Sequence, residues 1–551
     1  MRNDLIDCLK AGFEVGVGWT NEEGKLLDAY ESNRPENFAP GCWSVVGATL
    51  YRLTGEDRYL EWTERWVERT AAILEEAKGS PGFREYVMGY GAMVFPVLSG
   101  VVEAEKLADW KQAFANSYVE DAEFSDCHVS AASLVCDLYG DLDREEKAKK
   151  RAEAIVALFK VRMTPGGFLK DDDVNGNSIP HAYLTGSFMA AALLNSTPDT
   201  VDEEIADLFQ AMCAWFKRAN GAFDLPVLAS RSIYQMYVYP AAALLAYIGE
   251  GRQAEDRVRA LLAFCRSFNV EAGIFSHTPN HFSPYALAGL EWTYNRLNTD
   301  LGAGLVAWSL LALLAEQGWE GFETVRSAQV QNVIDPDGGY VVLHGTQARL
   351  GFTLCEHDFG YHLPLQPVSL RLSNEMIEPI ADAKRDGVKH PFRELIQDKS
   401  RMDPLLEPYF GVGVKGADGS YRVMSGRAEV VDEGEYRLLE GDLDLRFKPV
   451  VGDGWVRLTY EVGDVGSQDE VFFSVPVLLW DGKDELGYSI LEGMLRLRWK
   501  DASYRIWTEE NEGAWDLDMG RYLHAGYGLT ANMRIRLKPS SACTIAIEKL
   551  F

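Results

Sequence analysis

The sequence is short of positive charge. Its 551 residues include 54 Lys and Arg against 83 Asp and Glu, a formal net charge of -29 at pH 7. A surface this acidic repels nucleic acids and anionic membranes, so we expect neither as a partner. The same charge disfavours an anionic substrate unless its binding pocket is locally basic.

Paired cysteines, long apolar runs and a recognisable leader are also missing. The eight cysteines are scattered without a CxxC motif, which predicts buried free thiols and a reducing compartment. No apolar run reaches the roughly 18 residues of a membrane span. The first residues, MRNDLIDCLKAGFEV, have no apolar core or cleavage signature. We therefore expect a cytoplasmic protein, or a secreted one if a signal segment has been removed.

Several common catalytic motifs are absent as well. The chain has no GxGxxG followed by the expected acid, no P-loop, no GxSxG and no HExxH, which disfavours nucleotide-binding, serine-hydrolase and zincin functions. Its length predicts two or three domains, and its 47% hydrophobic residues are ordinary for a globular protein.

Two kinds of helix alternate up to about residue 330. Charged amphipathic helices are expected at 57–77, 144–159, 202–217 and 254–268. Nearly uncharged, Gly- and Ala-rich helices are expected at 42–51, 90–102, 128–138, 181–194, 234–248, 283–297 and 301–315, and such helices are buried all round. The alternation predicts an (α/α) toroid of about six or seven helix pairs over residues 1–328. An open helical solenoid is the alternative.

Strand patterns replace helices soon after Val325. Val, Leu, Tyr and Phe alternate with polar residues, and Asp-Gly or Gly-Asp turns separate the runs. Residues 329–551 are therefore predicted to form an antiparallel β-sheet (sandwich-like) domain, with an irregular excursion at 374–420.

The uncharged helices share one feature, because most begin with a polar or aromatic side chain after a loop. Each such residue alone is more often a helix cap or a core residue, but their recurrence favours one cavity ringed by helix N-termini. Free N–H groups and partial positive charge there suit a sugar. The residues are Trp43, Tyr90, His128, His181, Tyr234, His281 and Tyr285.

A second polar cluster lies within the strand-rich half: Arg349, His357, Asp358 and His362. His and Asp are zinc ligands, so a metal site is one interpretation. A histidine that reaches the cavity at the domain junction is another, and solvated loop residues are the third.

The order of an (α/α) toroid followed by antiparallel sheets resembles polysaccharide lyases of the heparinase II/III-like and alginate-lyase type. The segment from Asn175 through Asn177 to His181 resembles the family's Asn-rich loop that ends in a His. The segment from Asn220 to Tyr234 resembles its second motif, although Asn220 replaces the usual Asp and Gln235 the usual His.

The resemblance implies β-elimination on a uronic acid. His181, with Asn177 or Arg231, would neutralise the carboxylate, Tyr234 would exchange protons, and His357 or His362 would match the family's β-domain His. The catalytic residues implied are thus Tyr234, His181, Arg231 and His357, and those for substrate binding are Trp43, Tyr90, His128, Asn177, Asn280, His281, Tyr285 and Arg349.

The resemblance implies neither a cofactor nor a catalytic metal. A structural divalent metal at His357, Asp358 and His362 stays open. An oligo- or polysaccharide containing uronic acid is the expected partner, and assembly into a homo-oligomer is left open.

Two other functions fit the same sequence. A glycoside hydrolase would need two carboxyl groups about 5–10 Å apart, and the available acids are Asp126, Asp171 to Asp173, Glu271, Glu291 and Asp300. A glycan-binding protein without catalysis would need none of them.

Overall fold

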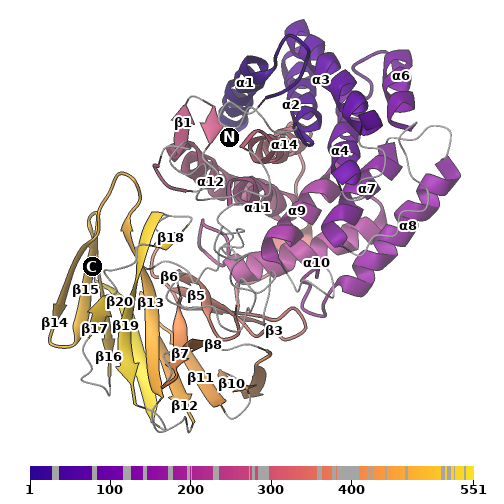
Figure 1. Cartoon of the computed structure of the whole chain (residues 1–551). Coiled ribbons are helices and arrows are strands. Elements are labelled where there is room, and N and C mark those ends of the chain that lie inside the picture. The colour runs from indigo at the N-terminus through magenta and orange to yellow at the C-terminus, as the bar shows by residue number, and fades with distance from the viewer. Residues whose placement is uncertain are drawn as a thin grey trace.

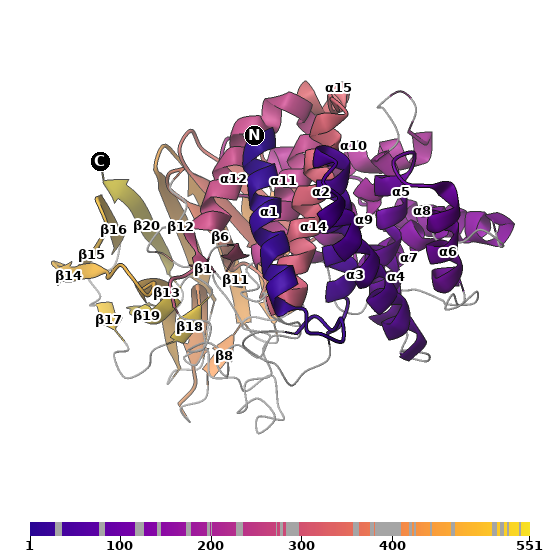
Figure 2. The same ribbon diagram turned by 90° about the horizontal axis from the view of Figure 1, so that it is seen from above.

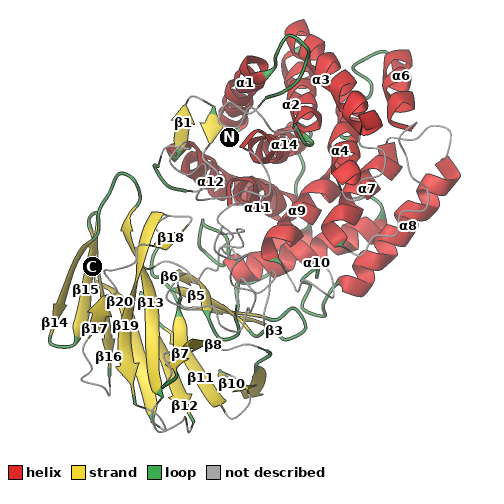
Figure 3. Cartoon of the chain, viewed as in Figure 1, coloured by secondary structure: helices red, strands yellow, loops and turns green. Residues whose placement is uncertain are grey.

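The structure is a computed structural model of the whole chain. It describes all residues except 28–35, 77–82, 116–125, 140–144, 172–177, 195–198, 200, 228–234, 272, 276–278, 283–296, 356–362, 375–379, 381–408, 418–420, 424–425, 433, 441–442, 464, 466–468, 510–514, 518–522, 526–527, 539–540 and 551. Helices fill one half of the molecule and strands the other (Figure 3).

Six helices form a closed ring in the helical half (Figure 1). Each contacts the next, and the last returns to the first. Closure confirms the predicted toroid and rules out an open solenoid, in which the first and last helices would not meet. The ring helices are α2 (Ala39–Thr54), α4 (Phe83–Ala92), α7 (Cys127–Tyr139), α9 (Ile179–Met189), α11 (Gln235–Glu250) and α14 (Leu297–Glu316).

A second layer of helices packs around this ring (Figure 1). In α3, buried residues recur every three or four positions, as in Tyr59, Thr63, Trp66 and Thr70, so one stripe faces the ring. The outer helices are α1 (Arg2–Trp19), α3 (Asp57–Glu76), α6 (Ala104–Ala115), α8 (Glu145–Arg162), α10 (Glu203–Asn220) and α12 (Glu255–Ser267). Shorter helical pieces are α5 (Val94–Leu98), η1 (Ala190–Leu193), η3 (Gly251–Ala254) and α15 (Glu323–Arg326).

Glycine permits the close approach of these helices. A Cβ at Gly47 of α2 would lie 2.4 Å from Oγ1 of Thr63 in α3. A Cβ at Gly89 of α4 would lie 2.7 Å from the carbonyl oxygen of Ala132 in α7. Both distances are below van der Waals contact, so any side chain there would push the helices apart.

Helix α14 is long and apolar enough to cross a membrane by length and composition. However, 94% of its apolar window is buried inside the protein. Its contacts with α2 and α11 identify it as a core helix of the ring.

Two local predictions differ from the structure. The helix expected at 90–102 begins earlier, at Phe83, and breaks between α4 and α5. Pro96 explains the break, because it has no N–H to bond the carbonyl of residue 92. A two-stranded hairpin of β1 (Asn269–Glu271) and β2 (Ile274–Phe275) was not expected. The helix expected at 283–297 falls almost wholly outside the described residues.

The strand half contains three larger antiparallel sheets. The four-stranded sheet comprises β3 (Val333–Asp335), β4 (Tyr340–His344), β5 (Arg349–Thr353) and β6 (Pro367–Arg371). The six-stranded sheet comprises β7 (Gly411–Lys415), β8 (Tyr421–Val423), β13 (Glu470–Trp480), β17 (Trp515–Leu517), β18 (Leu523–Ala525) and β19 (Gly528–Leu537). The eight-stranded sheet comprises β9 (Glu429–Asp432), β10 (Glu435–Glu440), β11 (Leu443–Val451), β12 (Trp455–Val462), β14 (Gly487–Leu491), β15 (Met494–Trp499), β16 (Ala502–Thr508) and β20 (Ala542–Leu550).

The inner face of the eight-stranded sheet packs on the other two sheets. Tyr460 of β12 contacts Phe473 of β13, with ring centroids 5.6 Å apart. Phe447 of β11 contacts Phe352 of β5 at 5.2 Å. Strand β7 lies inside the stretch 374–420 that was predicted to be irregular, and it pairs with β13. The described residues thus confirm the predicted fold class, a helical toroid followed by antiparallel sheets.

Buried polar contacts join the four-stranded sheet to the helical half. Oδ2 of Asp335, at the end of β3, accepts hydrogen bonds from Thr164 Oγ1 at 2.7 Å and Trp215 Nε1 at 3.1 Å. Because both donors belong to the helical half, the first strand is anchored to the toroid.

Candidate functional site

His128 and His181 lie at the starts of two neighbouring ring helices. His128 is the second residue of α7, and His181 is the third residue of α9. Ser178 caps α9, because its hydroxyl accepts the backbone N–H of His181 at 3.3 Å. Since α7 and α9 pack together, the two imidazoles meet at one rim of the ring.

Asp171 joins the two histidines. Its Oδ1 lies 2.7 Å from Nδ1 of His128, and its Oδ2 lies 2.7 Å from Nδ1 of His181. Its Oδ1 also accepts the backbone N–H of His128 at 3.2 Å, and its carbonyl accepts that of Cys127 at 3.1 Å. Asp171 therefore supplies an acceptor to the first turn of α7, where free N–H groups favour negative charge.

The carboxyl of Asp171 is held in its ionised form. Burial alone would raise its pKa, but the charges and hydrogen bonds of His128 and His181 outweigh burial and hold the pKa well below its usual range. An ionised carboxylate only accepts hydrogen bonds, so both Nδ1 atoms must donate. That assignment fixes the tautomer and the orientation of both rings at Nδ1.

The rings of His128 and His181 stack, with centroids 4.2 Å apart and planes 23° from parallel. The three side chains are of types that bind metals, and their ligand atoms lie within 4.8 Å of one another. A metal lies in the plane of each imidazole that binds it, so one ion cannot satisfy both of these stacked rings. The residues fit a hydrogen-bonded triad, and they do not fit a shared metal ion.

Tyr86 extends the rim on the other side of His128. Its ring centroid lies 5.9 Å from that of His128 and 5.5 Å from that of Phe38, which precedes α2. His128 and His181 are 14% and 13% exposed, and Tyr86 is half-buried. Rings from three successive ring helices, α4, α7 and α9, thus form one partly exposed surface that rests on the buried ring of Phe38. Tyr86 was not predicted from the sequence to be part of this surface.

Two predicted sugar contacts lie in the core instead. Trp43 is fully buried, and its Nε1 donates to the carbonyl of Gly12 at 3.1 Å. Tyr90 is 3% exposed and stacks on Phe38, with centroids 5.0 Å apart. Neither ring has a face open to a ligand in this structure. Trp43 is the fifth residue of α2 and Tyr90 lies near the end of α4, so both are away from the helix starts.

Arg349, another predicted sugar contact, is fully buried as well. Its Nη1 donates to the carbonyls of Asn220 at 2.9 Å and Leu225 at 3.0 Å, and its guanidinium lies over the ring of Phe223. The side chain of Asn220 accepts the N–H of Val227 at 2.8 Å. Arg349 and Asn220 thus brace the loop after α10, which leads toward Arg231 and Tyr234.

Asn280 and His281 lie where the helical half meets the strands. Asn280 is 2% exposed, and its Oδ1 accepts the N–H of Phe282 at 3.1 Å. His281 is exposed, and its N–H donates to the carbonyl of Asp481, just beyond β13, at 2.7 Å. Asn280 therefore shapes a turn, and of this pair only His281 presents a side chain to solvent.

The remaining predicted site residues fall outside the described part of the chain. They are Tyr234, Arg231, His357, Asn177 and Tyr285, together with Asp358 and His362 of the suggested metal site.

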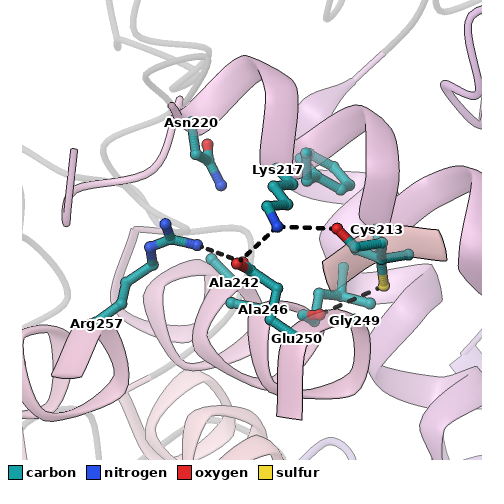
Figure 4. A pocket seen from close by; sticks show the side chains of 11 residues that line it. Cys213, Lys217, Asn220, Ala242, Ala246, Gly249, Glu250 and Arg257 are labelled. Atoms are coloured by element: carbon teal, nitrogen blue, oxygen red, sulfur yellow. Dashed lines mark hydrogen bonds and ion pairs between the residues drawn. The ribbon is translucent and has the colours of Figure 1, made fainter. Parts of the chain in front are cut away.

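A separate pocket lies between α10, α11 and the start of α12 (Figure 4). It encloses about 240 Å³, part of it open to solvent. Glu250 at its wall is 2.8 Å from Nη1 of Arg257 and 3.3 Å from Nζ of Lys217. Lys217 also donates to the carbonyls of Val325 and Arg326. Two hydrogen bonds and an ion pair therefore engage Lys217, so this cluster holds the helices together rather than presenting a free cation.

No protein-family model matches the sequence, and no match is found among curated proteins. Solved structures do match. The chondroitin AC lyase of Streptomyces coelicolor A3, solved in complex with chondroitin sulphate, is 9% identical over 100% of this chain and 79% of its own, with a TM-score of 0.53. Xanthan lyase from Paenibacillus is 8% identical over 99% of this chain and 57% of its own, with a TM-score of 0.50.

An alpha-1,6-mannanase from Salegentibacter sp. HEL1_6 also matches, at 12% identity over 56% of this chain and 99% of its own. Its TM-score is 0.41, too low to bear on the reaction of this chain. The two lyases, in contrast, match along nearly the whole chain. The resemblance to polysaccharide lyases built from an (α/α) toroid and antiparallel sheets is therefore confirmed at the level of the fold.

Proposed function

We propose that this protein is a polysaccharide lyase that cleaves a uronic-acid-containing glycan by β-elimination. The observation that carries the proposal is the triad of His128, Asp171 and His181 at the starts of two adjacent ring helices. The fold shared with chondroitin AC lyase and xanthan lyase supports it.

The proposed reaction removes the proton from C5 of the uronate. The electron pair of the broken C5–H bond forms the C4–C5 double bond. The C4–O bond then breaks with its electrons leaving on the oxygen of the departing sugar, and that oxygen gains a proton. The C5 proton is only weakly acidic until the adjacent carboxylate is neutralised. These steps move protons and a leaving oxygen, and they need no redox cofactor.

The triad offers groups for that neutralisation. Asp171 holds the ring of His181 by Nδ1, and Nε2 is the proposed donor to the substrate carboxylate as charge develops on it. His128 presents a second Nε2 beside the first, because the two rings are stacked. Tyr234 is proposed as the group that takes the C5 proton and protonates the leaving oxygen, with Arg231 and Asn177 assisting, by resemblance to the lyase motifs.

The triad is a poor match to glycoside hydrolysis. A hydrolase needs one carboxylic acid that is still protonated at working pH. Asp171 is one of the acids considered for that role, but its pKa is held low and both of its oxygens are hydrogen-bonded to histidines. It therefore acts as an acceptor that orients the rings.

The test is an assay of the intact protein against alginate, glucuronan, ulvan and glycosaminoglycan oligosaccharides. Elimination makes a 4,5-unsaturated product that absorbs in the near-ultraviolet, whereas hydrolysis makes reducing ends without that absorbance. We expect absorbance with at least one uronate, at least a hundredfold loss of kcat in His181→Ala and Tyr234→Phe, and no loss in the exposed control Lys150→Ala. Reducing ends without absorbance would replace the lyase proposal by a hydrolase, and binding without turnover would leave a glycan-binding protein.

A further inference from the structure

The solvent-facing side of the eight-stranded sheet carries a concentrated basic patch. Strands β12, β20, β16 and β15 lie side by side in this sheet, at the opposite end of the molecule from α8 (Figure 2). Alternate residues point inward and are buried, while the others face solvent. We define the arginine face by six of the outward residues: Arg457, Arg496, Arg498, Arg505, Trp455 and Trp507.

Strand register brings like charges together on this face. Arg496 of β15 lies directly opposite Arg505 of β16. Like charges at directly opposed positions destabilise a sheet. Nothing in the packing of the sheet calls for this pair, because both side chains point away from the core.

Stacking and ion pairs hold two of these arginines in place. The guanidinium of Arg457 lies 4.5 Å from the ring centroid of Trp455, and its Nε is 2.6 Å from Glu509. The guanidinium of Arg505 lies 4.6 Å from the ring centroid of Trp507, and its Nε is 2.5 Å from Glu548. A guanidinium held over an aromatic ring and in an ion pair is ordered in advance, so less entropy is lost when it binds an anion.

The other two arginines are exposed. Neither Arg496 nor Arg498 forms an ion pair with any residue in the part of the chain that the structure describes. Four arginines against the three carboxylates of Glu461, Glu509 and Glu548 leave an excess of one positive charge on this side of the four strands. That excess stands out on a molecule whose formal net charge is -29.

We propose that the arginine face binds an anionic polysaccharide through its carboxylate or sulfate groups, as a second glycan site apart from the His128–Asp171–His181 triad. Guanidinium forks match such groups bidentately. The face is a flat surface of adjacent strands, which suits an extended chain. The choice of a glycan over other polyanions rests on the proposed function. A polymer held here would raise the effective concentration of glycan at the protein.

The test is electrophoresis of the intact protein through gels containing alginate, polygalacturonate, chondroitin sulfate or neutral dextran. We expect retardation in at least one anionic gel and none in dextran. The double variant Arg496→Glu and Arg498→Glu should bind about two- to thirtyfold more weakly, the range for two exposed charge contacts. A matched control is Lys150→Glu with Arg259→Glu, which makes the same charge change at exposed sites on α8 and α12 and should bind as the wild type does.

Three results would overturn the proposal: no retardation of the wild type in any anionic gel, equal retardation of the Arg496/Arg498 double variant, or equal retardation by single-stranded DNA at matched charge. Turnover separates this proposal from the lyase proposal. If the protein is an active lyase but is not retarded, only the proposal of a second site is rejected. If the protein is retarded but shows no turnover, only the lyase proposal is rejected. If both hold, the double variant should raise KM for the polymer and leave kcat on a trisaccharide unchanged.

Discussion

The imidazole of His181 lies stacked on that of His128, with ring centroids 4.2 Å apart, because both rings donate to the one carboxylate of Asp171. The arrangement couples the starts of α7 and α9, since moving either ring breaks one of the hydrogen bonds that Asp171 accepts. The triad thus behaves as one unit, and Asp171 acts on a substrate only through the two histidines.

Replacing Asp171 by Asn should therefore impair the reaction more than the fold. The amide offers one acceptor oxygen and an NH₂ group, so at least one ring loses its partner and its fixed orientation. We expect kcat on the uronate found in the oligosaccharide assay to fall about 10- to 100-fold, the usual range for a group that orients a reacting side chain. The measurement is kcat and KM across pH, because the variant removes the carboxylate that the wild type holds ionised.

Asp137→Asn is the matched control. Asp137 is a buried carboxylate on α7, the helix of His128, but it bonds Arg151 of α8 rather than a histidine. We expect this control to lower the melting temperature and leave kcat within twofold. A fully active Asp171→Asn, or an Asp137→Asn with the same kinetic defect, would contradict the orienting role.

Sequence patterns predicted the fold well because its determinants are local. Uncharged helices such as 301–315 are buried on all faces, whereas charged ones such as 57–77 bury only one face. This difference in burial distinguishes the ring helices from the outer helices. The break near Pro96 was not predicted because apolar residues continue on both sides of it. Strand β7 was missed because its Gly-rich sequence, GVGVK, lacks clear alternation.

The candidate site was predicted only in part, because contacts between distant segments decide it. His128 and His181 were identified as helix starts, but nothing local indicates that they share Asp171, which was considered only as a hydrolase acid. The bridge between Met163 and Leu169 returns the chain so that Asp171 reaches the start of α7. Likewise, Trp43 and Arg349 look like ligand contacts in sequence, whereas packing buries both.

Arg349→Met should destabilise the protein. The substitution removes the donors to the carbonyls of Asn220 and Leu225, which are left without that partner in a buried region. We expect the free energy of unfolding to fall by about 2–4 kcal/mol in urea titrations, the loss for buried charge-assisted hydrogen bonds. Arg536→Met, at a side chain that is 70% exposed, should change it by less than about 0.5 kcal/mol. Equal effects of the two variants would show that Arg349 does not brace the loop.

His344 should make stability fall in mild acid. Burial, followed by the charge of Arg349, lowers the pKa of His344 to about 4, whereas an unfolded histidine titrates near about 6.5. The folded state therefore resists protonation, so the contribution of His344 is fully present above about pH 6.5 and is lost as pH falls toward about 4.

Between pH 7 and pH 4, we expect the free energy of unfolding to fall by about 1–3 kcal/mol less in His344→Gln than in the wild type, because glutamine does not titrate. The measurement is the difference in unfolding free energy between wild type and variant, from urea titrations at pH 7, 5.5 and 4. That difference should shift steadily in favour of the variant as pH falls. A difference that is constant across the three pH values would mean that His344 titrates normally in the folded protein.

Thiol labelling should distinguish one cysteine from the other seven. Seven cysteines are buried, and only Cys355 is half-buried. Burial raises the pKa of Cys8 to about 12 and that of Cys42 well above its ordinary value, so little thiolate is present there at pH 8. A thiol-specific aromatic disulfide reagent should therefore react rapidly with one equivalent in the native protein and with eight after denaturation. Cys355→Ser should abolish the rapid phase, and rapid reaction of two or more thiols in that variant would mean that the ring opens far more readily than its packing implies.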